Sequence, residues 1–224
     1  MKTDREMAKN KLRKFAEFDA FENTFDFESG RELRGRWKED YFGNDHPIVL
    51  ELACGKGEYT VNLAKMFPNK NFIGVDRKGD RLWRGAKSGI EEKLKNIAFI
   101  RILIEDITQF FDEGEVSEIW ITFPDPHPSK RREKKRLTYK RFLYLYKNIL
   151  QKNGIMHLKT DSDSLYESSM EQLNAFGAHL HCFTNNLYSS NLSDEVLFIK
   201  TYYEKMYLAE SKSINYIRWS FDNV

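Results

Sequence analysis

Cysteine, proline and long apolar runs are all scarce in this sequence of 224 residues. Its two cysteines, Cys54 and Cys182, form no C-x-x-C pair, which argues against both a disulfide scaffold and a structural zinc site. The most apolar stretch, residues 97–104, is interrupted by Arg101 and falls far short of the roughly 18 apolar residues that a membrane span needs. The basic N-terminus lacks the apolar segment of a signal peptide, so we expect a cytoplasmic protein with no membrane association.

Net charge is also scarce, because 36 Lys and Arg residues face 34 Asp and Glu residues. This average conceals an uneven distribution. Residues 130–136 contain six basic side chains and one acidic side chain, so the rest of the chain is net acidic. The hydrophobic content of 41% and the charged content of 31% are typical of a folded protein and exclude a disordered one.

The chain divides into two parts by pattern. Residues 1–46 carry leucine and phenylalanine at spacings of three and four, which predicts one or two amphipathic helices laid against a core. From residue 47 to residue 224, buried strands alternate with helices. The strands are expected at residues 48–52, 71–75, 98–104, 116–123 and 154–159, and the helices at 59–66, 80–94, 138–150 and 164–176. The pattern predicts an α/β fold with a Rossmann-like, doubly wound, mostly parallel sheet, closed by antiparallel strands at residues 181–184 and 214–221.

A glycine pair follows the first of these strands. Glycine allows the tight turn and the close ligand approach seen where such a strand enters a helix. A dinucleotide site would need a third glycine where Thr60 stands, so an NAD-dependent dehydrogenase is the less favoured alternative. The segment Glu51-x-x-x-Gly55-x-Gly57 instead matches E-x-x-x-G-x-G, the signature of S-adenosylmethionine-dependent methyltransferases.

Acidic residues follow the next two strands. Asp76 comes 19 residues after Gly57, close to the roughly 20 expected for a carboxylate that binds ribose hydroxyls. The third strand is expected to end at Glu105 and Asp106, and Asp106 can accept a hydrogen bond from an adenine amino group. Glu51 is expected to hold the ammonium group of the cofactor. The predicted cofactor-binding residues are therefore Glu51, Gly55, Gly57, Asp76 and Asp106.

Three of the five prolines lie at positions 124, 126 and 128, in a loop after the fourth strand. Proline fixes φ, so this loop should hold Asp125 rigidly at the mouth of the ligand crevice. The basic run of residues 130–136 follows at once and creates a positive field suited to phosphate groups. We therefore expect Asp125 to be catalytic and the basic run to contact nucleic acid.

These features form part of a longer series of motifs. In chain order they are Glu51-x-x-x-Gly55-x-Gly57, Phe123-Pro124-Asp125-Pro126 with its basic tail and Leu137-Thr138, Lys159-Thr160-Asp161, and Thr201-Tyr202-Tyr203-Glu204. Over about residues 48–221 the series resembles the tRNA (guanine-N7)-methyltransferase family. The resemblance implies methyl transfer from S-adenosyl-L-methionine to N7 of guanosine 46 in the variable loop of tRNA. The histidines show no metal-ligand spacing, so we expect no metal, and no obligate protein partner is apparent from the sequence, although some relatives of the family act with a second protein.

The resemblance also implies residue roles. The acids at 51, 76 and 106 would bind the cofactor, and Asp125 would belong to the active site. The predicted substrate-binding residues are Asp125, Ser129, Lys130, Arg131, Asp161, Thr201 and Glu204. The chain departs from the family pattern at three positions: Asp76 replaces the usual glutamate, His127 replaces tryptophan and Ser129 replaces lysine. Lys130 or Arg131 would then supply the missing cation.

Guanine N7 carries an in-plane lone pair and no proton, so its methylation needs no general base. Catalysis then consists of positioning the base and stabilising the positive charge that develops on it. We expect the carboxylate of Asp125 or Asp161 to contact N1–H and the exocyclic amine. The remaining alternative is a catalytically silent RNA-binding subunit, which is disfavoured because such a protein needs no cofactor crevice.

Overall fold

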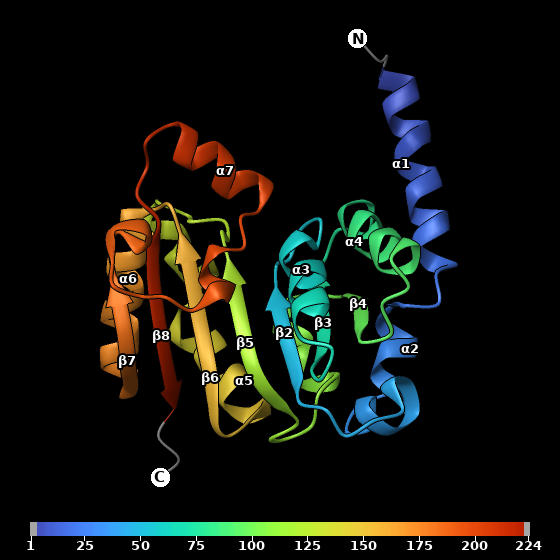
Figure 1. Ribbon diagram of the computed structural model, residues 1–224, viewed down its shortest axis with the longest axis horizontal. Helices are drawn as coiled ribbons and strands as arrows, with labels where there is room; N and C mark the ends of the chain where they lie inside the picture. Colours follow the sequence, from blue (N-terminus) through green and yellow to red (C-terminus); the bar gives the residue numbers. More distant parts are fainter. Residues whose placement is uncertain (1–3, 222–224) are drawn as a thin grey trace. The chain divides into compact units, whose positions relative to one another are not determined.

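The computed structural model describes residues 4–221 (Figure 1). The chain forms two compact units, and the boundary between them in the sequence lies between Phe110 and Phe111. Each unit has its own strands, and the helices connect them. No helix in residues 4–221 has both the length and the apolar character needed to cross a lipid bilayer.

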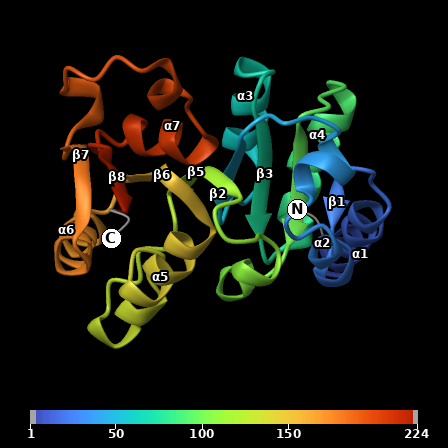
Figure 2. The ribbon, with the colours of Figure 1, turned by 90° about the horizontal axis from the view of Figure 1, so that it is seen from below.

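In the first unit, four strands run parallel in the order β1-β4-β3-β2. Its elements are α1 (Asp4–Asp19), β1 (Thr24–Phe25), α2 (Phe27–Glu32), the π-helix η1 (Trp37–Phe42), β2 (Ile48–Leu52), α3 (Glu58–Met66), β3 (Asn71–Asp76), α4 (Gly79–Glu91), β4 (Ile97–Arg101) and the 3₁₀ helix η2 (Ile104–Gln109). Every residue of β2 and β3 is buried, as is typical of parallel strands covered on both faces. Helix α1 packs on α4 (Figure 2).

The N-terminal segment contributes to the core of this unit. Its two-residue strand β1 pairs with β4, although the sequence pattern predicted only helices there, because so short a strand shows no periodicity. Trp37 is completely buried, and its Nε1 donates a hydrogen bond to the carbonyl oxygen of Phe110 at 2.8 Å. The boundary proposed after residue 46 stays a prediction.

In the second unit, four strands have the order β5-β6-β8-β7. Its elements are β5 (Val116–Thr122), the 3₁₀ helix η3 (Lys130–Lys135), α5 (Lys140–Ile149), β6 (Leu150–Thr160), α6 (Asp163–Phe176), β7 (Ala178–Thr184), the short 3₁₀ helices η4 (Leu187–Ser189) and η5 (Glu195–Phe198), α7 (Tyr202–Ala209) and β8 (Asn215–Phe221). Strands β5 and β6 are parallel, whereas β8 is antiparallel to both β6 and β7. Helices α5 and α6 lie on one side of these strands and α7 on the other (Figure 2).

The structure confirms the predicted fold class: a Rossmann-like α/β fold with mostly parallel strands and antiparallel closing strands. The predicted end of the third strand is wrong. Strand β4 ends at Arg101, so Glu105 and Asp106 lie on η2 rather than at a strand end. A short apolar run is compatible with either a strand or a short helix. Here the chain continues into η2, and the side chain of Ile107 on this helix is buried.

Candidate functional site

The glycine turn between β2 and α3 depends on left-handed backbone geometry. Gly55 has φ +57° and Gly57 has φ +67°, a region that other residues adopt only at a cost. A Cβ added to Gly57 would lie 2.5 Å from Cε1 of Phe99, whereas one added to Gly55 would meet no atom within 4 Å. Gly57 is therefore packed against the core, and Gly55 borders open space that a ligand can approach.

The carboxylate of Glu51 connects β2 to the start of α3. Glu51 is 2% exposed, and its Oε2 accepts hydrogen bonds from the backbone N–H of Thr60, at 2.8 Å, and from the Thr60 hydroxyl. The hydroxyl explains why threonine is useful at the position where a dinucleotide site would have glycine. The contact between Glu51 and the cofactor's ammonium stays a prediction.

Asp76, at the end of β3, braces the glycine turn. Its Oδ2 accepts a hydrogen bond from the backbone N–H of Gly55 at 3.0 Å, and its Oδ1 accepts one from the backbone N–H of Lys78 at 2.9 Å. Each carboxylate oxygen can accept a further hydrogen bond, so this arrangement is compatible with the predicted ribose contact.

Two more residues complete this edge of the first unit. Asp106 is partly buried on η2, and its Oδ1 accepts a hydrogen bond from Nε2 of Gln109 at 3.2 Å. Cys54 lies within the turn, and burial together with the charges of Glu51 and Asp76 raises the pKa of its thiol well above the usual range. The thiol is therefore a neutral, buried packing group.

These residues fit S-adenosylmethionine. The open space beside Gly55 is a place where a Cβ would obstruct a ligand, and the neighbouring carboxylates of Glu51 and Asp76 suit a cationic sulfonium and ammonium. Within residues 10–221, whose side chains the structure describes, no three His, Cys, Asp or Glu side chains are grouped so that they could hold a metal ion.

In the second unit, Arg136 holds the proline loop through hydrogen bonds to its backbone. This arginine is only 8% exposed, and its guanidinium donates hydrogen bonds to the carbonyl oxygens of Pro126 at 3.2 Å and of His127 at 3.2 Å. Phe123 and His127 both adopt positive φ, at +49° and +43°. Asp125, between them, is exposed, so the loop presents its carboxylate to solvent.

The basic run is thus divided by the structure. Ser129 and most basic side chains of η3, including Lys130 and Arg131, are exposed, whereas Arg136 is used inside the fold. Burial lowers the pKa of His127, with Asp125 opposing the shift, so its imidazole is neutral at neutral pH. The sequence pattern alone could not separate Arg136 from its neighbours.

A fully buried ion pair joins β6 to α7. Lys159 and Glu204 are both 0% exposed, and Nζ of Lys159 lies 2.8 Å from Oε1 and 2.9 Å from Oε2 of Glu204. The same ammonium donates to the carbonyl oxygen of Leu197 at 2.8 Å, and the hydroxyl of Tyr188 donates to Glu204 at 2.8 Å.

Thr201 completes this arrangement as the N-cap of α7, because its hydroxyl accepts a hydrogen bond from the backbone N–H of Glu204 at 3.2 Å. The structure therefore gives Thr201 and Glu204 an internal role that the sequence did not indicate. Their predicted contacts with substrate stay predictions.

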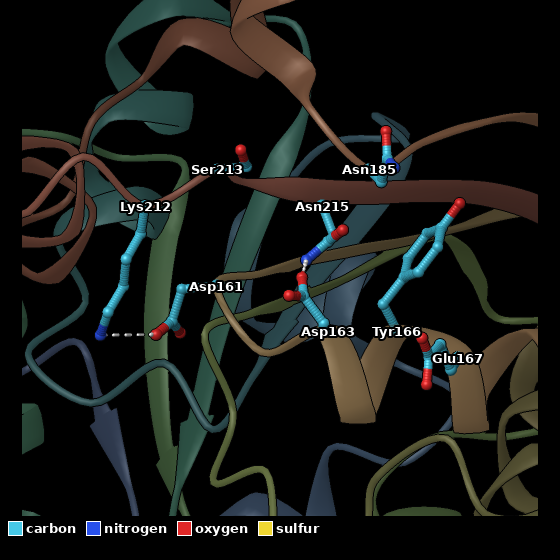
Figure 3. A pocket seen from close by; sticks show the side chains of 8 residues that line it. All are labelled: Asp161, Asp163, Tyr166, Glu167, Asn185, Lys212, Ser213 and Asn215. Carbon is cyan, nitrogen blue, oxygen red and sulfur yellow. Dashed lines mark hydrogen bonds and ion pairs between the residues drawn. The ribbon is translucent and has the colours of Figure 1, made fainter.

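Asp161 lines a cavity of about 410 Å³ beyond the end of β6 (Figure 3). Its Oδ2 lies 3.6 Å from Nζ of Lys212. The lining residues are Asp161, Asp163, Tyr166, Glu167, Asn185, Lys212, Ser213 and Asn215. Of the predicted substrate-binding residues, only Asp161 belongs to this cavity.

Comparison with known proteins agrees with this description. A family model described as a putative methyltransferase matches residues 45–216. Together with the Rossmann-like fold and the glycine turn, this match defines an S-adenosylmethionine-dependent methyltransferase.

The chain is 51% identical over 219 residues to the tRNA (guanine-N(7)-)-methyltransferase of Christiangramia forsetii, covering 95% of this chain and 98% of that one. The corresponding enzyme of Geobacillus kaustophilus is 40% identical over 181 residues, covering 81% and 82% of the two chains. The chain belongs to the tRNA (guanine-N7)-methyltransferase family.

Solved structures show the same fold at low sequence identity. The 16S rRNA methyltransferase KamB superposes with a TM-score of 0.63 at 13% identity, covering 83% of this chain and 92% of that one. The 16S rRNA (adenine(1408)-N(1))-methyltransferase of Catenulisporales acidiphilia, solved with S-adenosylmethionine, has a TM-score of 0.55 at 11% identity, with coverage of 82% and 90%.

The packing of Gly57 can be tested against Gly43, which has a similar φ of +63° but no atom within 4 Å of an added Cβ. Gly43→Ala should lower the free energy of unfolding by roughly 1–2 kcal/mol through backbone strain alone. Gly57→Ala should cost roughly 1–3 kcal/mol more because its Cβ overlaps the Phe99 ring. Urea denaturation measures both. Equal decreases would show that the ring does not restrict this position.

The buried ion pair can be tested by a double-mutant cycle. Lys159→Met should lower the free energy of unfolding by roughly 3–5 kcal/mol, because it leaves the Glu204 carboxylate buried without its cation. Lys159→Met combined with Glu204→Gln should cost clearly less than the sum of the two single changes. Additive effects in urea denaturation would contradict a direct interaction between the two side chains.

Proposed function

We propose that this enzyme transfers the methyl group of S-adenosylmethionine to N7 of a guanosine in tRNA, at position 46 of the variable loop. The proposal depends on one observation. Asp125 is exposed on a loop whose backbone is hydrogen-bonded to Arg136, and the exposed basic helix η3 follows this loop directly. An exposed carboxylate beside several exposed cations would suit a guanine base and the phosphates next to it. The names of the relatives support the same substrate.

The chain's own residues would act by placement and electrostatics. Bound S-adenosylmethionine supplies an electrophilic methyl group, and guanine N7 needs no deprotonation. Asp125 and Asp161 would accept hydrogen bonds from the N–H groups of the guanine and thereby orient it, a contribution that can reach roughly 7–11 kcal/mol for well-placed reactants. Their negative charges would also stabilise the positive charge that methylation creates on the base.

The expected target site follows from RNA geometry. In a paired helix, N7 of guanine faces the deep, narrow groove of A-form RNA, which side chains cannot reach. A guanosine in an exposed or distorted loop is accessible, and the variable loop of tRNA is such a segment. The exposed side chains of Lys130 and Arg131 on η3 would position the RNA through its phosphates.

The reaction can be tested by incubating the enzyme with labelled S-adenosylmethionine and unmodified tRNA, followed by nucleoside analysis and mapping of the modified position. We expect 7-methylguanosine at position 46. Asp125→Asn and Asp161→Asn should each lower kcat/KM by about tenfold or more, because an amide is a weaker hydrogen-bond acceptor than a charged carboxylate. Glu171→Gln, an exposed change on α6, is the matched control. Label in another nucleoside, or near-wild-type rates for both aspartate variants, would contradict the proposal.

The divided basic run predicts two kinds of variant. Lys130→Ala and Arg131→Ala should weaken tRNA binding, and each should reduce the slope of log K against log salt by roughly 0.7–0.9 for every phosphate that the removed side chain neutralises. Arg136→Ala should lower activity at every salt concentration, because it releases the proline loop, while leaving the slope unchanged. Filter-binding titrations over a range of salt concentrations measure the slopes. If only Arg136→Ala reduced the slope, the phosphate contact would belong to Arg136 and not to Lys130 or Arg131.

A further inference from the structure

Helices α1 and α4 pack side by side in the first unit and present a local excess of positive charge (Figures 1 and 2). Residues 10–19 and 77–90 contain eight basic side chains and three acidic ones, although the whole chain has a net charge of only +2. Two of the three acids are compensated locally, because Glu17 pairs with Arg13 and Asp19 lies 3.8 Å from Arg101. The α1–α4 basic surface is defined here by Lys11, Lys14, Arg77, Lys78, Arg81 and Arg84.

The α4 side of this surface is centred on Arg81 and Arg84. Both side chains are exposed, and a separation of three residues places them on the same face of the helix, with their Cβ atoms about 5–6 Å apart. Arg77, just before the helix, is exposed as well. No ion pair or side-chain hydrogen bond within residues 10–221 involves any of these three guanidinium groups. They are therefore available to an anion from outside the chain.

This placement of charge works against the stability of α4. Like charges three residues apart on a helix repel each other, and a cation in the first turn, where Arg81 lies, opposes the helix macrodipole. Ion pairing is used elsewhere on the same helix, since Nζ of Lys87 lies 3.8 Å from Oε1 of Glu91. A row of unpaired arginines at this position indicates a ligand whose negative charge offsets the repulsion.

The α1 side holds its cations over aromatic rings. Nζ of Lys14 lies 4.8 Å from the centroid of the Trp83 ring, and Nζ of Lys11 lies 5.9 Å from that of Phe15. Trp83 is only 9% exposed, and its Nε1 donates a hydrogen bond to Oε2 of Glu17 at 2.7 Å. The Trp83 ring is thus fixed between the two helices and keeps the ammonium group of Lys14 next to α4.

A long polyanion fits this surface better than a small anion. The six cations come from two helices and the segment before α4, so a single phosphate group could contact only a few of them. An RNA strand carries one negative charge per nucleotide, and its successive phosphates are spaced similarly to the side chains of Arg81 and Arg84. The planar guanidinium group also binds phosphate oxygens through paired N–H donors.

The α1–α4 basic surface adjoins the residues that are expected to hold S-adenosylmethionine. Arg77 and Lys78 follow Asp76 directly in the sequence. Oδ1 of Asp76 accepts a hydrogen bond from the backbone N–H of Lys78 at 2.9 Å, and its Oδ2 accepts one from Gly55. An RNA strand bound at Arg77 would therefore pass close to the glycine turn.

We propose that the α1–α4 basic surface binds the phosphate backbone of tRNA, in addition to the contact expected from η3. The guanidinium groups of Arg77, Arg81 and Arg84 bind successive phosphates, and Lys11 and Lys14 extend the contact onto α1. The surface supplies affinity and does not touch the reacting base. This inference rests on the proposed function, because it takes tRNA as the substrate.

The test compares two double variants that remove the same charge from the first unit. Arg81→Gln with Arg84→Gln should reduce the slope of log K against log salt by roughly 1.4–1.8, the value for two lost phosphate contacts, and should raise the Kd for tRNA about tenfold. Lys93→Gln with Lys95→Gln is the matched control. Both lysines are exposed and precede β4, whereas Arg77 follows the parallel neighbour β3, so the control lies at the opposite end of these strands. In filter-binding titrations the control should keep the wild-type slope.

Two further measurements separate RNA contact from a role in the fold. Arg81→Lys with Arg84→Lys keeps both charges and should therefore keep the wild-type slope. Thermal denaturation of Arg81→Gln with Arg84→Gln should give an unchanged or higher Tm, because the variant relieves repulsion on α4. A lower Tm together with weaker binding would show that the arginines support the fold, and would overturn the inference.

The remaining outcomes are also distinct. An unchanged slope for Arg81→Gln with Arg84→Gln, or an equal reduction in the lysine control, would overturn the proposed contact. If that arginine variant bound tRNA normally but lost wild-type binding to vesicles of phosphatidylserine and phosphatidylcholine, the surface would serve a membrane instead. Failure of the proposed function would appear separately, as the absence of 7-methylguanosine with wild-type enzyme, because the slopes are measured without catalysis.

Discussion

The buried ion pair between Lys159 and Glu204 is the interaction on which the packing of α7 in the second unit depends. Removing two charges from water is costly, and the cost is offset only where each charge has several well-placed partners. Here the ammonium also reaches a backbone carbonyl of the segment before α7, and the carboxylate also accepts from Tyr188. The pair therefore holds α7 and the preceding segment against the end of β6, next to Asp161.

The first unit uses the same physical device on a smaller scale. Glu51 and Asp76 are both acids that a methyltransferase would direct toward its cofactor, yet each also accepts hydrogen bonds from the backbone around the glycine turn. A carboxylate bound in this way is preorganised, so little free energy is needed to order it when a ligand binds. The two carboxylates therefore stabilise the glycine turn and the start of α3.

Charged residues that are neighbours in the sequence differ in how deeply the fold buries them. The basic run appears uniform along the chain, but Arg136 is turned inward to the proline loop while Lys130 and Arg131 remain at the surface. The cavity near Asp161, by contrast, is acidic. The exposed basic helix η3 and the acidic cavity therefore offer opposite electrostatic environments within one unit.

Local pattern was sufficient for much of this protein. The alternation of strands and helices, the left-handed glycines and the loop that exposes Asp125 follow from short stretches of sequence, because each depends on neighbouring residues. The sequence did not predict strand β1, the end of β4, or the internal partners of Arg136 and Glu204. Lys159 and Glu204 are 45 residues apart, and Asp163 and Asn215 are 52 residues apart. Only the packing of distant strands and helices brings such pairs together, so the tertiary structure alone decided which charged side chains are exposed and which support the fold.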